Sequence, residues 1–582
     1  MGTSLIDSDS LLAIDIGAVN TRATLFDVVD CRYRFIGMGI APTTVGAPFF
    51  DAGEGVRQAL DQLKQTTGRE LIDADEQMII PARPDGTGVD TCVATISAGS
   101  PLKVVAVGLL DDISTESAVR LASTTYAQVV EKLNLLDRRK TSSRLDAILR
   151  TRPDLVIVAG GTEGGAFRSV EVMLDPVGLA CYLLPESERP EILYVGNSSL
   201  ADEAERTIGS LAHLSIAPNI RPAIEMEQLT PAQKQLGRLY RSIRCKQIPG
   251  VSELDAWTKG STLPTAAAFG RIVRFLSKVY DPAKGVLGID IGASAATIAA
   301  SFAGDLSLGV YTDLGLGPNL PSLLKISKME DIKRWLPMDM PEADLRDYVY
   351  NKSIRPQAIP VTKEELAVEL ALARRVMQIA LRRILRRLPQ RKAVSSSMPY
   401  FEPILAAGSV LTNAPSVGQA MLAILDGIQP TGVTTVVLDQ NNIAGSLGAA
   451  AEVNAILPVH ILESNTFLNL GTVVSPVGNA QMGSPVMRIR VSGEGDKDTT
   501  IEVKYGTIEL LPLPLGKSAT LHIQPSGKFD VGMGGPGRGG SVRVAGGALG
   551  VVIDGRGRPI RLPSDDEKRY EAMTKWLWTF GS

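Results

Sequence analysis

The sequence predicts an α/β protein that contains a duplicated domain and ends in an all-β domain. The duplication is predicted by one pattern that occurs twice. A strand, an Asp-Ile-Gly tripeptide and a returning strand are found at residues 11–28 and again at 286–302. The all-β domain is predicted by the short alternating segments, separated by Gly and Pro, that fill the chain after residue 459. We therefore expect domains over residues 1–284, this one with insertions, 285–458 and 459–582.

The first hairpin begins with LLAIDI, residues 11–16, which has the continuous apolar character of a buried strand. Gly17 is typical of a turn, and TRATLFDV, residues 21–28, has the partial alternation of a returning strand. Residues 286–302 repeat this order as VLGIDIGASAATIAASF. A single copy is most often only a tight hairpin, but two copies in the same order indicate a duplicated fold.

A carboxylate at a strand end beside a glycine turn is suited to phosphate chemistry. Backbone N–H groups of the turn can bond phosphate oxygens, and the carboxylate can hold a hydrated Mg²⁺ ion that neutralises them. We expect Asp15 and Asp290 to hold that metal through water. The other nucleotide-binding residues expected in the two hairpins are Gly17, Thr21, Arg22, Gly292 and Ala293.

Composition restricts the location and the partners. A net charge of -3 and an aromatic content of 5% argue against a nucleic-acid partner. The four cysteines are scattered without a CxxC pair, which is typical of reduced thiols. The N-terminal MGTSLIDSDS lacks the parts of a signal peptide, and the apolar runs are shorter than the ~20 residues that span a bilayer. We expect a cytoplasmic protein without a membrane span.

Residues 361–388 carry the clearest helical pattern. Thr362 and Glu365 form the pattern of a capping box, and apolar residues follow at helical spacing. Three arginine pairs, at 374/375, 382/383 and 386/387, give this helix a basic flank. Such a flank is typical of a solvated face, and a surface for an anionic partner is the alternative.

Several segments resemble, in order, the actin/hexokinase/heat-shock-chaperone ATPase superfamily. The two hairpins resemble its phosphate-1 and phosphate-2 motifs, PTAAAFGRIVRFL at 264–276 its first connecting helix, and ILAAGSVLTNAPSVGQAML at 404–422 its adenosine loop. The resemblance implies two ribonuclease-H-like domains around a cleft that binds ATP and Mg²⁺. It also implies nucleotide contacts at Gly408 and Ser409.

A narrower resemblance covers residues 10–460. ISAGSPLKVVAVGLLDDISTESAVRLA at 96–122, PDLVIVAGGTEGG at 153–165, LYVGNSSLADEA at 193–204 and NKSIRP at 351–356 look like the accessory-protein family encoded beside cobalamin-dependent glutamate mutase. This family is called MutL or GlmL and is unrelated to mismatch repair. The resemblance implies an ATP-binding accessory or assembly protein, such as a chaperone or reactivation factor for a cobalamin-dependent mutase.

The chain departs from the superfamily pattern where hydrolysis is concerned. The second motif commonly reads DIGGATTD, whereas here Ala295 and Ala296 replace hydroxyl residues and Thr297 replaces a carboxylate. Leu263 stands where the chaperone branch has a glutamate, and leucine can neither orient water nor accept a proton. We expect ATP hydrolysis to be weak or absent. The remaining catalytic candidates are Asp15, Asp290 and Glu163.

Two alternative functions stay open. A metabolite kinase of the same superfamily would need a carboxylate base, for which Asp111 or Asp112 is the candidate and helix capping the ordinary explanation. A self-assembling actin-like scaffold would use the nucleotide only structurally. The expected partners are therefore a nucleotide together with a partner protein or further copies of this chain.

Overall fold

The computed structural model describes residues 9–388, 398–493 and 499–581, and the chain divides into two compact units. Unit 1 consists of Met1–Val28, Ile36–Ala268 and Gly309–Thr312, and unit 2 of Val29–Phe35, Phe269–Leu308 and Asp313–Ser582. Most of the N-terminal segment assessed for a targeting signal lies outside the described residues. Within the described ranges, no helix combines the length and the apolar character needed to cross a membrane.

The first sheet of unit 1 consists of β1 (Leu11–Ile16), β2 (Asn20–Val29), β3 (Arg32–Pro42), β4 (Thr91–Ile96) and β10 (Leu263–Pro264). These strands lie in the order β10-β4-β1-β2-β3. β1 is antiparallel to β2 and parallel to β4, and β10 is parallel to β4. Numbered by their succession within this sheet, the strands are arranged as 3-2-1-4-5.

The sheet of unit 2 begins with β13 (Asp305–Tyr311), β12 (Ala296–Phe302), β11 (Gly285–Ile291), β14 (Phe401–Ala407) and β15 (Gly432–Leu438), in that spatial order. Again the first strand is antiparallel to the second and parallel to the fourth. The arrangement 3-2-1-4-5 is therefore repeated. This repeat is the actin-like, or ribonuclease-H-like, fold, so the predicted fold class is confirmed.

A third sheet is inserted in the chain between β4 and β10; insertions were expected in this domain, but not a separate sheet. It consists of β5 (Leu102–Val107), β6 (Ala127–Leu133), β7 (Leu155–Val158), β8 (Glu191–Tyr194) and β9 (Leu214–Ile216). All neighbours are parallel, in the order β6-β5-β7-β8-β9. This 2-1-3-4-5 order is that of a flavodoxin-like, doubly wound sheet.

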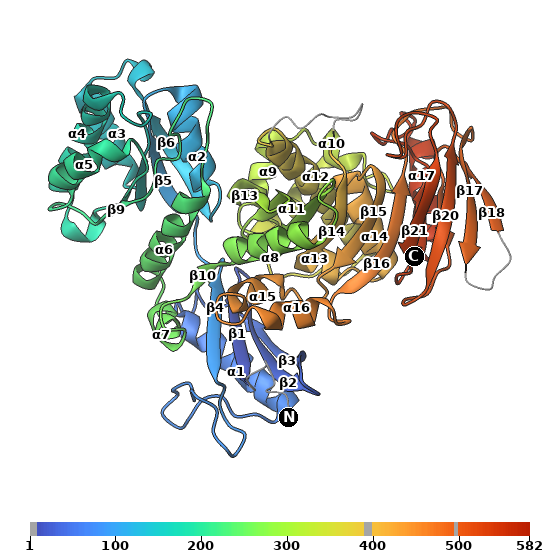
Figure 1. Ribbon diagram of the computed structural model, residues 1–582, viewed down its shortest axis with the longest axis horizontal. Helices are drawn as coiled ribbons and strands as arrows, with labels where there is room; N and C mark the ends of the chain where they lie inside the picture. Colours follow the sequence, from blue (N-terminus) through green and yellow to red (C-terminus); the bar gives the residue numbers. More distant parts are fainter. Residues whose placement is uncertain (1–8, 389–397, 494–498, 582) are drawn as a thin grey trace. The chain divides into compact units, whose positions relative to one another are not determined.

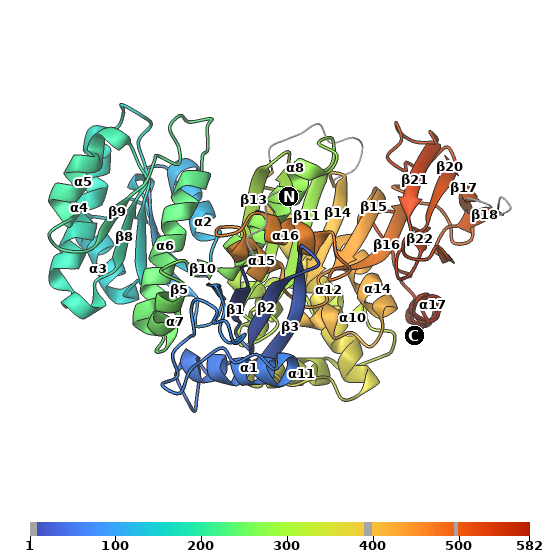
Figure 2. The same ribbon diagram turned by 60° about the horizontal axis from the view of Figure 1, so that its bottom comes forward.

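Helices cover both faces of the inserted sheet, as Figures 1 and 2 show. One face carries α3 (Thr141–Thr151), α4 (Phe167–Leu183) and α5 (Ala201–Ile208), and the other carries α2 (Glu116–Ala122) and α6 (Thr230–Gln247). Strands β5, β7 and β8 are almost fully buried. Such continuous apolar strands are expected where helices pack on both faces.

The C-terminal residues are rich in β-structure, as predicted, and form two sheets. Strands β16 (Leu468–Ser475), β22 (Val551–Asp554) and β19 (Ile508–Leu511) continue the unit 2 sheet beyond β15. Strands β17 (Pro485–Gly493), β18 (Thr499–Lys504), β20 (Ser518–Pro525) and β21 (Gly540–Ala545) form a separate antiparallel sheet. The expected boundary at 458 therefore does not coincide with the edge of a sheet. The domain limits at 284 and 458 stay predictions.

Helices α12 (Lys363–Leu385) and α14 (Val417–Ile428) carry two members of a buried ion network. Asp426 on α14 accepts from Arg374 of α12 at 2.7 Å and from Arg556 at 2.6 Å. Asp554, at the end of β22, accepts from Arg556 at 2.8 Å and from Arg558 at 2.7 Å. The network joins the C-terminal segment to the helices that cover the unit 2 sheet.

Two of the arginines on α12 correct the expectation of a solvated basic flank. Arg374 belongs to the buried network, and Arg375 is buried and pairs with Asp331 at 2.8 Å. A third, Arg383, forms a two-pronged pair with Asp313, both distances being 2.7 Å. The sequence pattern could not reveal these carboxylates because they are distant in the chain. The capping box of Thr362 and Glu365 is confirmed.

Candidate functional site

The first candidate half-site lies at the end of β1 in unit 1. Gly17 closes the turn to β2, with its N–H donating to the Asn20 carbonyl at 3.0 Å. A Cβ atom on residue 17 would lie 2.7 Å from that carbonyl oxygen, so the turn needs glycine. The register places Asp15 opposite Arg22 on β2. Asp15, Gly17, Thr21 and Arg22 are thus brought together.

The carboxylate of Asp15 is buried and receives hydrogen bonds from two other elements. The hydroxyl of Thr95, on β4, donates to Oδ1 at 2.7 Å, and that of Thr265, at the start of α8 (Thr265–Val279), donates to the same oxygen at 3.0 Å. Arg22 approaches Oδ2 at 3.4 Å. Three donors from separate segments therefore fix the orientation of this carboxylate.

Hydroxyl groups also support the turn itself. The Thr43 hydroxyl donates to the Gly17 carbonyl at 2.7 Å, which leaves it to accept from the fully buried Thr21 hydroxyl at 3.0 Å. The Thr43 N–H donates to the Val19 carbonyl at 2.8 Å. Thr43, Thr95 and Thr265 were not predicted, because an isolated threonine has no sequence signal; only the topology brings them to Asp15 and Gly17.

Leu263 lies next to one of the residues that bond to Asp15. Leu263 lies on β10 and pairs with Thr95, one of the two hydroxyl residues that hold Asp15. Glu253 and Asp255, the acidic residues that precede it in the chain, lie on α7 (Val251–Trp257) and face Arg57 at 3.5 Å and Arg241 at 3.9 Å. Neither of them contacts Asp15.

Glu163 lies on the loop after β7 in the inserted sheet and does not join Asp15. It accepts from the Asn219 amide at 2.8 Å and from the Ser198 hydroxyl. Burial by itself raises the pKa of Glu163, but the hydrogen bonds from Ser198 and Asn219 outweigh it and hold the pKa below its usual range. Asp111, which follows β5, accepts from Asn134 in the same sheet region at 3.3 Å.

The second candidate half-site, in unit 2, repeats the geometry of the first. Gly292 follows Asp290 and closes the turn to β12, its N–H donating to the Ala295 carbonyl at 3.1 Å. Asp290 is paired in the sheet with Thr297 on β12 and with Ala407 on β14. The side chains of residues 295–297, where the superfamily commonly has polar groups, are buried here.

A glycine-containing loop that the sequence analysis did not single out packs on this second turn. The N–H of Leu316 donates to the Gly292 carbonyl and that of Gly317 to the Ala293 carbonyl, both at 3.0 Å. A Cβ atom on Gly315 would lie 2.3 Å from the Ala293 carbonyl oxygen. Asp313, at the start of this loop, pairs with Arg383 in the last turn of α12. The loop therefore holds the turn at Gly292 and Ala293 in place.

Gly408 directly follows β14 and has a φ of 107°, a conformation that other residues rarely adopt. A Cβ atom there would lie 2.4 Å from the Ile291 carbonyl oxygen. Its N–H donates to the Asn442 side chain at 2.8 Å, and Ser409 starts the short helix α13 (Ser409–Thr412). Gly408 and Ser409 therefore directly follow the strand whose last residue, Ala407, is paired with Asp290.

Asp439 directly follows β15 and stabilises the start of the next helix. Its carboxylate caps α15 (Ala444–Ala450) by accepting from the N–H groups of Ile443 at 3.0 Å and Ala444 at 2.7 Å.

Within the described part of the chain, no group of three or more His, Cys, Asp or Glu residues could hold a metal ion directly.

Comparison with known proteins identifies the family. The model of the family described as MutL protein matches residues 11–466. The chain belongs to the MutL protein family. A relative, the Protein MutL of Clostridium tetanomorphum, is 22% identical over 395 residues, which cover 64% of this chain and 78% of that protein.

Two solved structures illustrate the similarity of this MutL-family chain to other proteins. A nucleotide-free acetone carboxylase shares 14% identity, with 85% of this chain and 81% of that chain covered and a TM-score of 0.33. Component A of (R)-2-hydroxyglutaryl-CoA dehydratase from Acidaminococcus fermentans shares 8%, with 76% and 97% covered and a TM-score of 0.26. Because both scores are low, the fold assignment rests on the repeated strand order.

Proposed function

We propose that this MutL-family protein is an ATP-binding accessory or assembly protein. The observation that carries the proposal is the repeated hairpin: in both sheets an Asp-Ile-Gly turn ends the first strand and returns as the antiparallel second. We propose that each hairpin contributes phosphate contacts to one ATP, that Asp15 and Asp290 hold its Mg²⁺ through water, and that Gly408 and Ser409 contact the adenosine.

Titration calorimetry with ATP·Mg²⁺ tests this proposal. The wild-type chain should bind one equivalent, and the double variant Asp15→Ala, Asp290→Ala should give no binding heat. Asp305→Ala is the matched control, because Asp305 is an exposed aspartate at the start of β13 and should leave binding unchanged. A wild-type chain without binding heat, or a double variant with full heat, would refute the proposal.

We propose that hydrolysis by the isolated chain is very slow. The groups around Asp15 are hydroxyls and a guanidinium, and Leu263 stands beside Thr95 where a carboxylate would be useful. In-line attack needs a positioned water and stabilisation of the leaving phosphate. The metabolite-kinase alternative is not favoured, because Asp111 and Asp112 follow β5 of the inserted sheet and Asp111 bonds Asn134 there.

For the partner, we propose a cobalamin-dependent mutase, which the family resemblance implies. The four cysteines are free, which fits the reducing cytoplasm that we propose as its location. Size-exclusion chromatography of the chain mixed with a purified cobalamin-dependent mutase should show co-elution that depends on ATP·Mg²⁺. If the two proteins elute separately with and without nucleotide, the partner proposal fails while the ATP titration still decides the binding proposal.

A further inference from the structure

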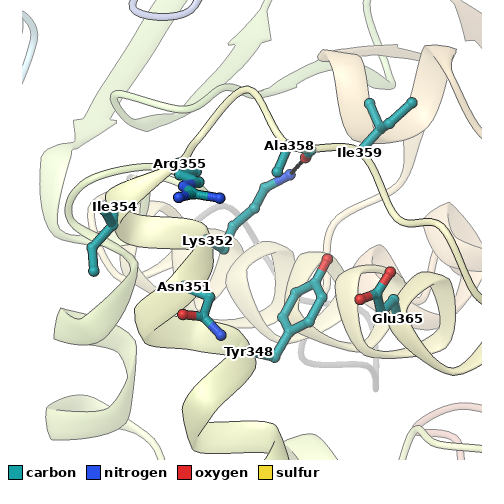
Figure 3. Close-up of a pocket in the computed structure, with 8 residues that line it drawn as sticks. All are labelled: Tyr348, Asn351, Lys352, Ile354, Arg355, Ala358, Ile359 and Glu365. Carbon is teal, nitrogen blue, oxygen red and sulfur yellow. Dashed lines mark hydrogen bonds between the residues drawn. The ribbon is translucent and has the colours of Figure 1, made fainter.

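A pocket of about 460 Å³ lies in unit 2 between α11 (Glu342–Ile354) and the start of α12 (Figure 3). Its volume is in the range of cavities that bind small molecules or the side chains of a partner. It includes part of the NKSIRP segment, residues 351–356, which the proposed nucleotide contacts do not use. The pocket is lined by Tyr348, Asn351, Lys352, Ile354, Arg355, Ala358, Ile359 and Glu365.

The floor of the pocket is polar and internally paired. Lys352 is buried, donates to the Ala358 carbonyl, as the dashed line in Figure 3 marks, and pairs with Glu369 at 3.0 Å. The Tyr348 hydroxyl donates to Glu369 at 2.8 Å. Burial, followed by the charge of Glu369, raises the pKa of Tyr348. These contacts fix the shape of the pocket and neutralise the Lys352 ammonium group.

Arg355, by contrast, is left with its donors available. It is exposed, and within the described ranges its guanidinium forms no hydrogen bond or ion pair with another residue. Figure 3 shows the guanidinium beside Lys352, directed into the pocket. The carboxylate that also lines the pocket, Glu365, is used at the far side to accept from the N–H groups of Val361 at 2.7 Å and Thr362 at 3.3 Å.

The rim of the pocket exposes aliphatic side chains. Ile354 and Ile359, which line the pocket, are each 76% exposed. Clustered exposed apolar residues beside polar ones mark interaction sites. A small molecule inside the pocket would leave this rim in water, whereas a polypeptide that enters the pocket would also cover it. The occupant that fits is therefore a protein segment.

We propose that this pocket docks a segment of a partner protein in which an acidic residue lies next to aliphatic residues. Arg355 would form a two-pronged pair with the partner's carboxylate, and Asn351 lines the same pocket with an amide that can donate beside it. Ile354 and Ile359 would pack on the aliphatic residues. The inference deepens the proposed accessory function, on which it rests only for the expectation of a protein partner.

Selection from a phage-displayed library of random 12-residue peptides against the full chain tests the inference. The enriched peptides should share an Asp or Glu beside an aliphatic residue. A synthetic peptide of the enriched sequence should bind at least tenfold more weakly to Arg355→Ala and to Ile359→Ser. Arg346→Ala and Ile326→Ser are matched controls, since Arg346 is exposed nine residues earlier on α11 and Ile326 is an exposed isoleucine at the end of α9 (Leu323–Ile326).

Three outcomes would overturn the inference: no enriched sequence, enriched peptides without an acidic residue, or equal affinity for wild type and Arg355→Ala. Circular dichroism of each variant shows whether it remains folded, independently of nucleotide binding. If the wild type fails to bind ATP, the proposed function falls, while the peptide affinities still decide the docking surface.

Discussion

The side chain of Asp15 is held by residues from three parts of unit 1 that are far apart in the chain. Asp15, Thr21 and Arg22 could be predicted as site residues because they belong to one hairpin with a local signature. Thr95 and Thr265 could not, since their roles arise from the pairing of β1 with β4 and from the position at which α8 begins. The sequence therefore predicts the residues of this site only where they are close together in the chain.

The assignment of Leu263 leads to a gain-of-function prediction. Leu263→Glu should raise the rate of phosphate release by the isolated chain at least tenfold, because a carboxylate beside Thr95 could orient water. A positioned general base is typically worth ~10²–10⁴ in rate. Single-turnover phosphate release measures the effect, with Leu263→Gln as the matched control that cannot act as a base. Equal rates for the two variants would contradict the assignment.

Gly408 supplies a second prediction at this scale. Gly408→Ala forces a side chain onto a φ of 107° and places its Cβ 2.4 Å from the Ile291 carbonyl oxygen. We expect a loss of about 1–3 kcal/mol in the free energy of unfolding together with weaker ATP binding. Gly527→Ala, where no atom lies within 4 Å of the new Cβ, is the control. Urea unfolding and calorimetry measure both effects, and wild-type behaviour of Gly408→Ala in each would refute the prediction.

At the scale of elements, the sequence predicted the segments that have a clear periodicity or a capping motif. It did not predict the short strands of the inserted sheet. The helix predicted at 361–388 is observed as α12 with its capping box, and the predicted hairpins are β1–β2 and β11–β12. The inserted sheet was missed because β7, β8 and β9 are only three or four residues long. Apolar runs of that length do not distinguish a strand from a buried helix, although their alternation with helices was a usable signal.

The buried ion network predicts how the C-terminal segment is stabilised. Asp554→Asn should lower the free energy of unfolding by about 3–5 kcal/mol, because it leaves Arg556 and Arg558 buried beside a neutral group. Urea unfolding followed by tryptophan fluorescence measures this, since Arg556 lies 4.7 Å from the ring centroid of Trp576. The control is Glu571→Gln, which breaks an exposed Glu571–Lys575 pair and should lower the free energy of unfolding far less than Asp554→Asn does. Equal losses would contradict the prediction.

The same carboxylate predicts a pH dependence. Burial alone raises the pKa of Asp554, but Arg556 and Arg558 outweigh it and hold the pKa well below its usual range. A lowered pKa in the folded state adds stability above the unfolded pKa, near 3.9, and this stability is lost as the pH falls. Wild-type stability should therefore decline from about pH 5 downward more steeply than that of Asp554→Asn. Parallel declines would show that Asp554 is not the titrating group.

At the scale of the whole molecule, the chain combines a duplicated fold with an inserted sheet that has its own core. Buried side chains from β5 to α5 pack together in this insert, among them Val105, Ile148, Val156, Val177 and Ile192. Domains with a separate core often fold alone. We predict that a fragment of residues 100–248 folds cooperatively in urea and has the circular dichroism of an α/β domain. A fragment that lacks a cooperative transition would show that the insert depends on the rest of unit 1.

The two strands that connect the insert to the first sheet, β4 and β10, also position the residues that bond to Asp15. β4 leads into the inserted sheet and β10 returns from it, and the two strands are neighbours. Thr95 lies on the outgoing strand and Thr265 directly follows the incoming one, and these are the two hydroxyls that grip the Asp15 carboxylate. The two strands that connect the insert to the rest of unit 1 are therefore also the ones that place the hydrogen-bond donors to Asp15. We therefore expect a force applied to the insert to reach the Asp15 carboxylate through these two hydroxyls.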